Sequence, residues 1–350
     1  MGSDQHFCRL AGGAALLVLG WWVGLAEPAA ADPPRPTDYR STITGTSPAS
    51  DVIEVEVLGG DSFLQLRVDE DHEAVVLGYD QEPYLRFRAD GTVEENVNSE
   101  ATYANASRYG NVDLPRSFDA NAEPQWKQVG EGGRYAWHDH RIHWMSPQPP
   151  AGLPRGSEIQ RWKVELVVDG EPVTVNGVLR IEPAVAWWPW VLVTIGVAAL
   201  AFVLGRRTQQ AAVARVAAAA ACLVAIIVAG AQQRSIPAEA GRNFMMVAVP
   251  AVGLGCALAA WFLPRPRVAD AAGLAAASMA GGWALLRLAV FTKPVLPTDL
   301  DPALDRAGTA LALGLATAAA VLLLTADRRT VLEAEDEESD EESVVSGAAE

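Results

Sequence analysis

The chain has 350 residues, of which 50% are hydrophobic, and it carries a formal net charge of −16. Proteins that bind nucleic acid need clustered Lys and Arg, so this charge argues against a nucleic-acid partner. Residues 187–327 consist largely of Ala, Leu, Val and Gly, whereas residues 32–185 mix apolar and polar positions. We therefore expect a mixed fold class, with an all-β domain followed by an all-α membrane domain.

Residues 1–31 have the pattern of a signal peptide. Arg9 precedes the apolar run Leu10–Leu25, and the triplet Ala29–Ala31 is typical of a signal peptidase site. We expect cleavage after this triplet, so that the mature chain begins at Asp32. An uncleaved membrane anchor is the alternative, and in both cases the next domain would be exported.

Period-two alternation between residues 40 and 182 predicts β-strands. It is clearest in four segments: Ile53–Val57, Phe63–Val68, Tyr84–Arg88 and Trp162–Val168. Asp90-Gly91 and Asp169-Gly170 each join two such runs, and Asp-Gly is a strong hairpin signal. Several short strands separated by turns predict an immunoglobulin-like β-sandwich over residues 32–185. Residues 96–131 lack periodicity, and we expect a long connection there.

The run Trp137–Met145 (WHDHRIHWM) holds three of the five histidines of the chain. In an extended strand, His138 and His140 would share one face while His143 and Met145 would share the other. A helix would bring His140 next to His143, but the glycines before the run and the prolines after it favour a strand or an irregular turn. A bend at the centre of the run would gather the three imidazoles.

Two interpretations of this run remain open. In the first, His138, His140, His143 and Met145 are metal ligands, with copper as the cofactor, because imidazole suits Cu and a thioether shifts the preference toward Cu(I). In the second, the run is a rigid seam, and its aromatic and arginine side chains bind a protein partner outside the cytoplasm or the bilayer surface. The candidate partner-binding residues are Trp137, Arg141 and Trp144. The chain has no serine or cysteine nucleophile motif and no His-Glu-x-x-His signature, so we expect no enzyme activity.

The hairpin Asp169-Gly170-Glu171-Pro172 resembles the last hairpin of the CopC family, periplasmic copper-binding β-sandwiches of which some are fused to CopD-type membrane helices. The plan of leader, β-domain and helices is similar too, which implies copper handling outside the cytoplasm. Two positions depart from that family: Glu171 stands where a copper-ligating His is usual, and Asp32 rather than His would begin the mature chain. The chain is also similar to uncharacterised bacterial membrane proteins that carry a WHDHRxHWM run, a resemblance that implies no function.

Five apolar segments approach the roughly 20 residues that a membrane crossing requires. These predicted transmembrane helices are 187–205, 211–231, 243–263, 269–291 and 304–326. With the β-domain outside, the arginine pairs Arg206-Arg207 and Arg328-Arg329 fall on the cytoplasmic side, as the positive-inside rule favours. Arg215 and Arg287 lie near segment ends, where we expect them to reach the bilayer surface. The sequence therefore predicts a multi-pass protein of the cell membrane.

The predicted transmembrane domain covers residues 186–328, and residues 329–350 form the tail. No His, Glu or Lys lies inside a predicted helix, so an anchor is favoured over a transport pathway. Eight of the ten residues in 333–342 are acidic, and we expect a disordered cytoplasmic tail. The function predicted overall is a membrane-anchored extracytoplasmic binding protein that handles copper; the alternative is a membrane adaptor or scaffold.

Overall fold

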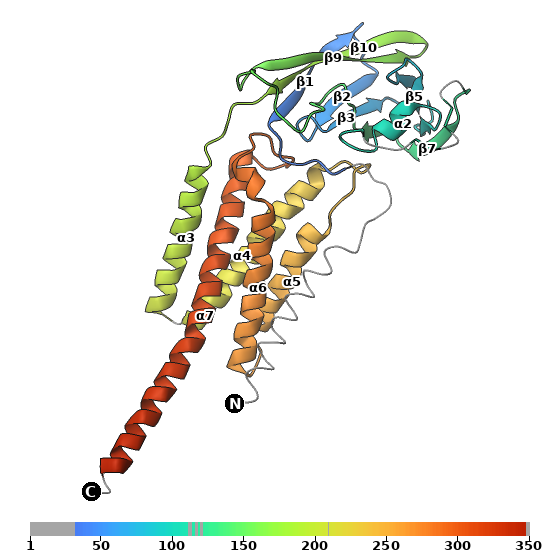
Figure 1. The fold of residues 1–350 in the computed structure, drawn as a ribbon. Coiled ribbons are helices and arrows are strands. Elements are labelled where there is room, and N and C mark those ends of the chain that lie inside the picture. Colours follow the sequence, from blue (N-terminus) through green and yellow to red (C-terminus); the bar gives the residue numbers. More distant parts are fainter. Residues whose placement is uncertain (1–31, 111–113, 116–117, 120–121, 209, 348–350) are drawn as a thin grey trace.

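The computed structural model describes residues 32–347 except 111–113, 116–117, 120–121 and 209, and describes side chains as far as residue 325. The predicted signal peptide, residues 1–31, lies outside the described residues. A β-sheet domain is followed along the chain by a helical domain, in agreement with the predicted mixed class, and the β-domain sits on one end of the helices (Figure 1).

The β-domain contains two antiparallel sheets. The larger sheet has seven strands in the order β1 (Tyr39–Ser47), β10 (Glu171–Ile181), β9 (Glu158–Val168), β4 (Ala74–Leu77), β5 (Pro83–Phe87), β6 (Val93–Asn96) and β7 (Trp126–Gly130). The smaller sheet has three strands in the order β2 (Ile53–Leu58), β3 (Phe63–Val68) and β8 (Arg134–Trp137). One hydrophobic cluster joins the sheets: it contains Leu64, Leu66 and Trp137 from the smaller sheet, together with Phe87 and Leu166 from the larger.

The strands lie where the alternating pattern predicts them, because alternate residues must face the shared core. Both Asp-Gly hairpins are confirmed as the β5–β6 and β9–β10 turns. Asp169 and Gly170 have φ values of 49° and 86°, the positive φ at both central positions that type I′ hairpin turns require. The prediction of a structureless connection over 96–131 is wrong in part, because this segment holds the short helix α2 (Glu100–Ala104), capped by Ser99, and strand β7.

The helical domain contains five helices and one 3-10 turn. These are α3 (Trp188–Arg207), α4 (Gln210–Ser235), α5 (Met245–Ala259), α6 (Pro266–Leu286), η1 (Leu288–Phe291) and α7 (Pro302–Gly347). Within the described residues, four of them are long and apolar enough to cross a membrane, namely α3, α4, α6 and the first 24 residues of α7. At 15 residues, α5 is apolar but shorter than a typical crossing. The protein is therefore a membrane protein.

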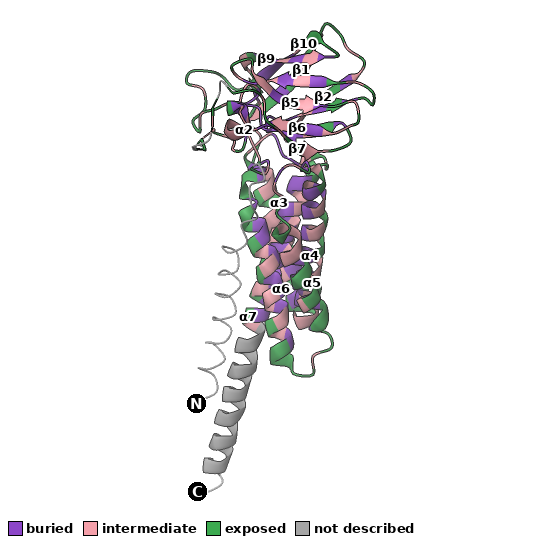
Figure 2. Ribbon diagram, turned by 90° about the vertical axis from the view of Figure 1, so that its right-hand side faces the viewer, coloured by how far each residue is buried: buried purple, intermediate pink, exposed green. Residues whose placement is uncertain are grey.

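Small residues let these helices approach closely, and the buried surface faces the interior of the bundle (Figure 2). A Cβ atom added at Gly314 of α7 would lie 2.7 Å from the backbone oxygen of Thr194 in α3. Because lipid chains are as apolar as the helices, such close packing is a main source of association between helices in a membrane.

Arg287 does not reach outward from the bundle, in contrast to the prediction. Only 6% of the residue is exposed, and its guanidinium donates to both carboxylate oxygens of Asp305 at 2.6 and 2.8 Å. It also donates to Gln232 of α4 and lies over the ring of Trp283. An ion pair between the C-cap residue of α6 and α7, in which one guanidinium nitrogen donates to both carboxylate oxygens, therefore closes the bundle near the β-domain.

The tail also differs from the prediction of disorder, because α7 continues without a break to Gly347. Residues 326–346 contain no Gly or Pro, and many of them are Glu or Ala, which favour helix. Extending a helix that already exists also avoids the unfavourable step of helix nucleation.

Contacts of three kinds join the β-domain to the helical domain among the residues that the structure describes. Thr37, just before β1, pairs with Val295 in the loop between η1 and α7, through backbone hydrogen bonds of 2.9 and 3.1 Å. Asp38 forms an ion pair with Lys293 of the same loop. Phe63 of β3 belongs to a buried cluster that also contains Ile236, from the connection between α4 and α5. The two domains therefore share both hydrogen bonds and apolar core.

Candidate functional site

The histidine run begins at the end of β8 and turns away from the sheet. Trp137 is the last strand residue, and the amide of Ile142 donates to the carbonyl of Asp139 at 3.0 Å, which forms a tight turn. The ring centroids of His140 and His143 lie 5.2 Å apart, and those of His138 and His143 lie 6.3 Å apart. The bend considered from the sequence is confirmed, and the fully extended strand is wrong.

A buried ion pair fixes the turn. Asp139 is completely buried, and its carboxylate accepts hydrogen bonds from Arg141 Nε at 2.8 Å, Arg141 Nη2 at 2.7 Å and Trp137 Nε1 at 2.9 Å. Burial alone would raise the pKa of Asp139, but the charge and hydrogen bonds of Arg141 lower it below its usual value. Arg141 also donates to the carbonyl of Leu77 at 3.1 Å and so ties the turn to the end of β4.

The three imidazoles hold backbone segments rather than one another. His140 Nε2 lies 3.0 Å from the carbonyl oxygen of Ser107, and His143 Nε2 lies 2.7 Å from that of Arg108. His138 contacts two carbonyl oxygens, with Nδ1 2.5 Å from Ser62 and Nε2 3.0 Å from Asp32. The run therefore fastens the segment after α2, the β2–β3 turn and the beginning of the described chain.

Burial keeps two of these rings neutral. It lowers the pKa of His143 to about 3, and the nearby Arg108 guanidinium and His140 ring contribute to this shift. Burial also lowers the pKa of His138. A neutral imidazole has a single N–H donor, so His138 can donate to only one of its two carbonyl neighbours at neutral pH.

The structure gathers the three predicted histidine ligands but commits their Nε2 atoms to carbonyl oxygens. Met145 is 39% exposed, on the side of the run that faces solvent. Within the described ranges, no group of three or more His, Cys, Asp or Glu residues is placed to hold a metal ion. The His140 and His143 Nδ1 atoms are the ring nitrogens not engaged with these carbonyls, so copper binding stays a prediction that rests on them.

The candidate partner-binding residues are mostly internal. Trp137 is 3% exposed and packs in the core of the β-domain, where it leaves little surface for a partner. The Arg141 guanidinium is bound to Asp139, and Trp144 is half-buried, with its indole N–H donating to the Gln148 carbonyl at 2.6 Å. The interpretation of the run as a rigid, packed segment thus agrees with these contacts. These three side chains do not form an exposed surface for a partner.

A second buried ion pair lies under the run and was not predicted. Asp61, at the β2–β3 turn, is completely buried, and its carboxylate accepts from Arg108 Nη2 at 2.6 Å. Burial raises the pKa of Asp61 to about 6, although the Arg108 charge and hydrogen bond oppose this shift. The two residues are 47 positions apart, so no local pattern could have paired them.

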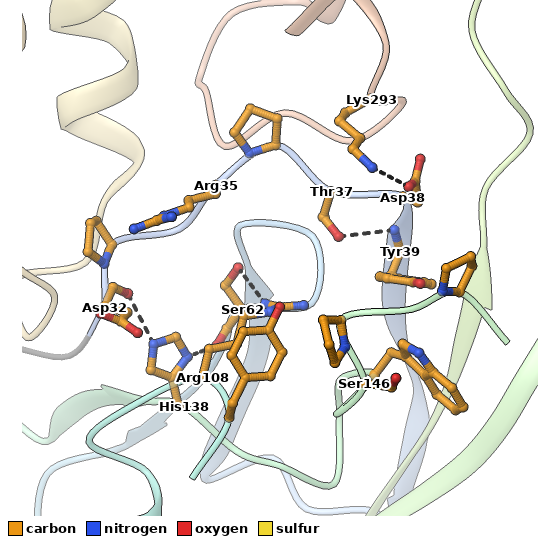
Figure 3. Close-up of a pocket in the computed structure, with 16 residues that line it drawn as sticks. Asp32, Arg35, Thr37, Asp38, Tyr39, Ser62, Arg108, His138, Ser146 and Lys293 are labelled. Atoms are coloured by element: carbon orange, nitrogen blue, oxygen red, sulfur yellow. Dashed lines mark hydrogen bonds and ion pairs between the residues drawn. The ribbon is translucent and has the colours of Figure 1, made fainter. Parts of the chain in front are cut away.

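Beside the run lies a pocket of about 330 Å³ between the β-domain and the helical domain (Figure 3). Its walls come from the segment 32–39, the segment 144–149 that ends the run, and Lys293 of the η1–α7 loop. His138 lines the pocket, and Figure 3 shows Arg35 and Arg108 on its walls. The histidine run thus helps to form a cavity to which both domains contribute.

Comparisons of the chain with protein-family models, with curated proteins and with solved structures found no match.

Proposed function

We propose that the protein is a membrane-anchored binding protein whose β-domain lies outside the cytoplasm and whose ligand site is the pocket at the domain junction. The observation that carries the proposal is the composition of this pocket, which is lined by residues of the β-domain and by Lys293 of the helical domain and has a volume within the range of small-molecule sites. The buried histidines and ion pairs support its walls and make the site rigid. Binding rather than catalysis follows from the commitment of the run's polar groups to structural hydrogen bonds.

The arrangement in the membrane is part of the same proposal. The arginines at the helix ends distant from the β-domain, such as Arg206 and Arg207, favour a cytoplasmic location for those ends. The chain would then be exported through the predicted signal peptide, with α5 and its flanking residues as a fifth crossing. We also retain the immunoglobulin-like type for the two-sheet domain, since two antiparallel sheets share one core.

Location is tested with single cysteines in a chain from which Cys8, Cys222 and Cys256 have been removed. Met145→Cys lies beside the pocket, and Thr208→Cys lies in the exposed connection between α3 and α4. A membrane-impermeant maleimide added to intact cells is expected to label Met145→Cys, but Thr208→Cys only after permeabilisation. The reverse pattern would refute the proposed orientation.

Occupancy of the pocket is tested by filling it. The full chain, purified in detergent, is expected to retain a non-covalent adduct in native mass spectrometry. Ser146→Trp, which places a large side chain at the wall, should remove the adduct, whereas Thr44→Trp on the exposed side of β1 should not. An adduct that survives Ser146→Trp, or none in the unaltered chain, would contradict the pocket as the ligand site.

Copper binding is a second candidate, favoured by one observation. Four buried side-chain atoms without a hydrogen-bond partner gather around the run, within the part of the chain that the structure describes: Asp61 Oδ1, Asn105 Nδ2, Ser107 Oγ and His143 Nδ1. Such atoms commonly mark an internal water or ion. A histidine that ligates a metal usually donates its other N–H to a carbonyl, as His140 and His143 do.

Titration of the full chain with Cu(I) tests this candidate. Micromolar or tighter binding that disappears in the double variant His140→Ala/His143→Ala would support it. His72→Ala is the matched control, because His72 pairs with Asp169 at a partly exposed turn away from the run. Equal binding by the double variant and the control would exclude the run as the copper site.

A further inference from the structure

The charges around the junction pocket indicate what kind of ligand it accepts. Four cationic groups lie in or beside it, facing three carboxylates; the cations are Arg35, Arg108, Arg155 and Lys293, and the carboxylates are Asp32, Asp38 and Asp61. These seven side chains together have one positive charge in excess, and cleavage before Asp32 would add the positive charge of its α-amino group. An anionic ligand would offset this excess.

The cations differ in whether they are already paired. Arg108 is bound to the buried Asp61, and Lys293 shares Asp38 with Arg155. Arg35 lines the pocket, is exposed, and makes no ion pair within the described ranges of the chain. Its guanidinium is thus the one among these four cations that has no carboxylate partner, and its planar donors match the oxygens of a phosphate.

Hydroxyl groups complete the lining. Thr37, Tyr39, Tyr109 and Ser146 line the same pocket, and hydroxyls donate hydrogen bonds to anionic oxygens. Tyr109 is 44% exposed at the wall and offers an aromatic face as well. A phosphodiester has one negative charge and four oxygens, a combination that suits this mixture of one free guanidinium and several hydroxyls.

The position of the pocket favours a lipid as the source of that phosphate. Lys293 follows η1 at the end of α6, and this end of the bundle is also where α3 begins (Figure 1). Trp187 and Trp188, at the beginning of α3, are 56% and 57% exposed. Exposed indoles at a helix end mark the level of the bilayer surface, where phospholipid headgroups lie.

We infer that the junction pocket binds the phosphate-bearing headgroup of an anionic phospholipid, held by Arg35 and by Lys293. This inference rests on the proposed ligand site and names its ligand class. Basic pockets next to membrane helices are suited to such headgroups, because attraction to the anionic lipid adds to burial of its polar part. The headgroup would contact both domains and so strengthen their junction.

The test uses the delipidated full chain in detergent micelles, incubated with phosphatidylglycerol or with phosphatidylcholine of the same acyl chains. Lipid retained per protein is counted by native mass spectrometry. The unaltered chain is expected to retain phosphatidylglycerol at least fivefold better than phosphatidylcholine. Equal retention of the two lipids would overturn the inference.

Charge variants locate the site. Arg35→Gln is expected to lower phosphatidylglycerol retention at least fivefold, and Arg35→Lys to restore most of it. Lys293→Gln should lower retention too. Arg161→Gln is the matched control, because Arg161 lies on β9 with a side chain 85% exposed and should leave retention unchanged. Lys293→Gln also removes the ion pair with Asp38 and could loosen the junction between the domains. In that case, the phosphatidylglycerol retention of the Arg35 variants decides the test.

Two further outcomes separate the possible causes of failure. Inorganic phosphate that displaces phosphatidylglycerol at equal concentration would show a site for a free anion and overturn the lipid assignment. An adduct that Ser146→Trp removes, but that is not an anionic phospholipid, would leave the proposed ligand site in place and refute only this inference. If the unaltered chain retained no adduct, or if its adduct survived Ser146→Trp, the proposed site itself would be refuted.

Discussion

Breaking the Asp139–Arg141 pair should destabilise the β-domain more than any surface charge change. Arg141→Gln removes two side-chain hydrogen bonds and the compensating charge from a carboxylate that is completely buried. Loss of one partner of a buried ion pair costs about 3–5 kcal/mol, because the other charge is left without compensation. The Arg141 side chain is 19% exposed, so water screens part of the pair and the cost should be near 3 kcal/mol.

The measurement is urea-dependent pulse proteolysis of the full chain in detergent, which reports the fraction of β-domain that remains folded. Asp139→Asn combined with Arg141→Gln removes both charges and should recover about half of the loss, since no unpaired charge remains. Arg161→Gln, which removes an exposed charge, should cost less than about 0.5 kcal/mol. If Arg141→Gln costs no more than Arg161→Gln, or if the double variant is no more stable than Arg141→Gln, the argument for the run as a structural lock is wrong.

The remaining predictions concern pH and the helix bundle. Because the pKa of His143 falls from 6.5 to about 3 on folding, only the unfolded state binds its proton between these values, and between pH 7 and pH 5 this residue alone should contribute about 2 kcal/mol of destabilisation. The pKa of Asp61 rises from 3.8 to about 6, so the folded state binds that proton first and offsets about 1 kcal/mol over the same interval. Burial raises the pKa of Glu95 to about 7, and this group offsets about 2 kcal/mol more over the same interval. Relative to the unaltered chain, Asp61→Asn should therefore shift the change in stability from pH 7 to pH 5 toward destabilisation, and His143→Gln should shift it toward stabilisation; profiles of both variants that run parallel to that of the unaltered chain would contradict the assignment. In the bundle, Asp305→Asn leaves Arg287 without its carboxylate and should lower the thermal unfolding temperature in detergent by several degrees, whereas no change would mean that water already compensates this charge.

The sequence predicts most of the strands but little of the candidate site. Strand positions follow from a period-two pattern, because one face of each strand must meet the core, and the Asp-Gly turns mark two hairpins. The sequence allows a bend in the histidine run but does not favour it over an extended strand. The carbonyl groups that hold the rings lie in distant segments, and nothing within those nine residues indicates them. The Asp61–Arg108 pair and the contact between Asp38 and Lys293 depend on how separate elements pack.

The helix predictions show the same division. Composition identifies the apolar segments, because a bilayer requires long runs without charge. It does not reveal that Arg287 faces Asp305 across two helices, since either residue alone near a segment end is compatible with exposure to the bilayer surface. The pairing of Arg287 with Asp305 follows only from the three-dimensional arrangement of the helices.

The apolar contact between Phe63 of β3 and Ile236 of the α4–α5 connection has a practical consequence. Cutting the chain near residue 186, where the composition changes, would uncover Phe63 and remove the strand-like partner of Thr37. A fragment made that way would expose an apolar patch that is buried in the intact molecule. Its aggregation would therefore say nothing about how well the full-length protein folds.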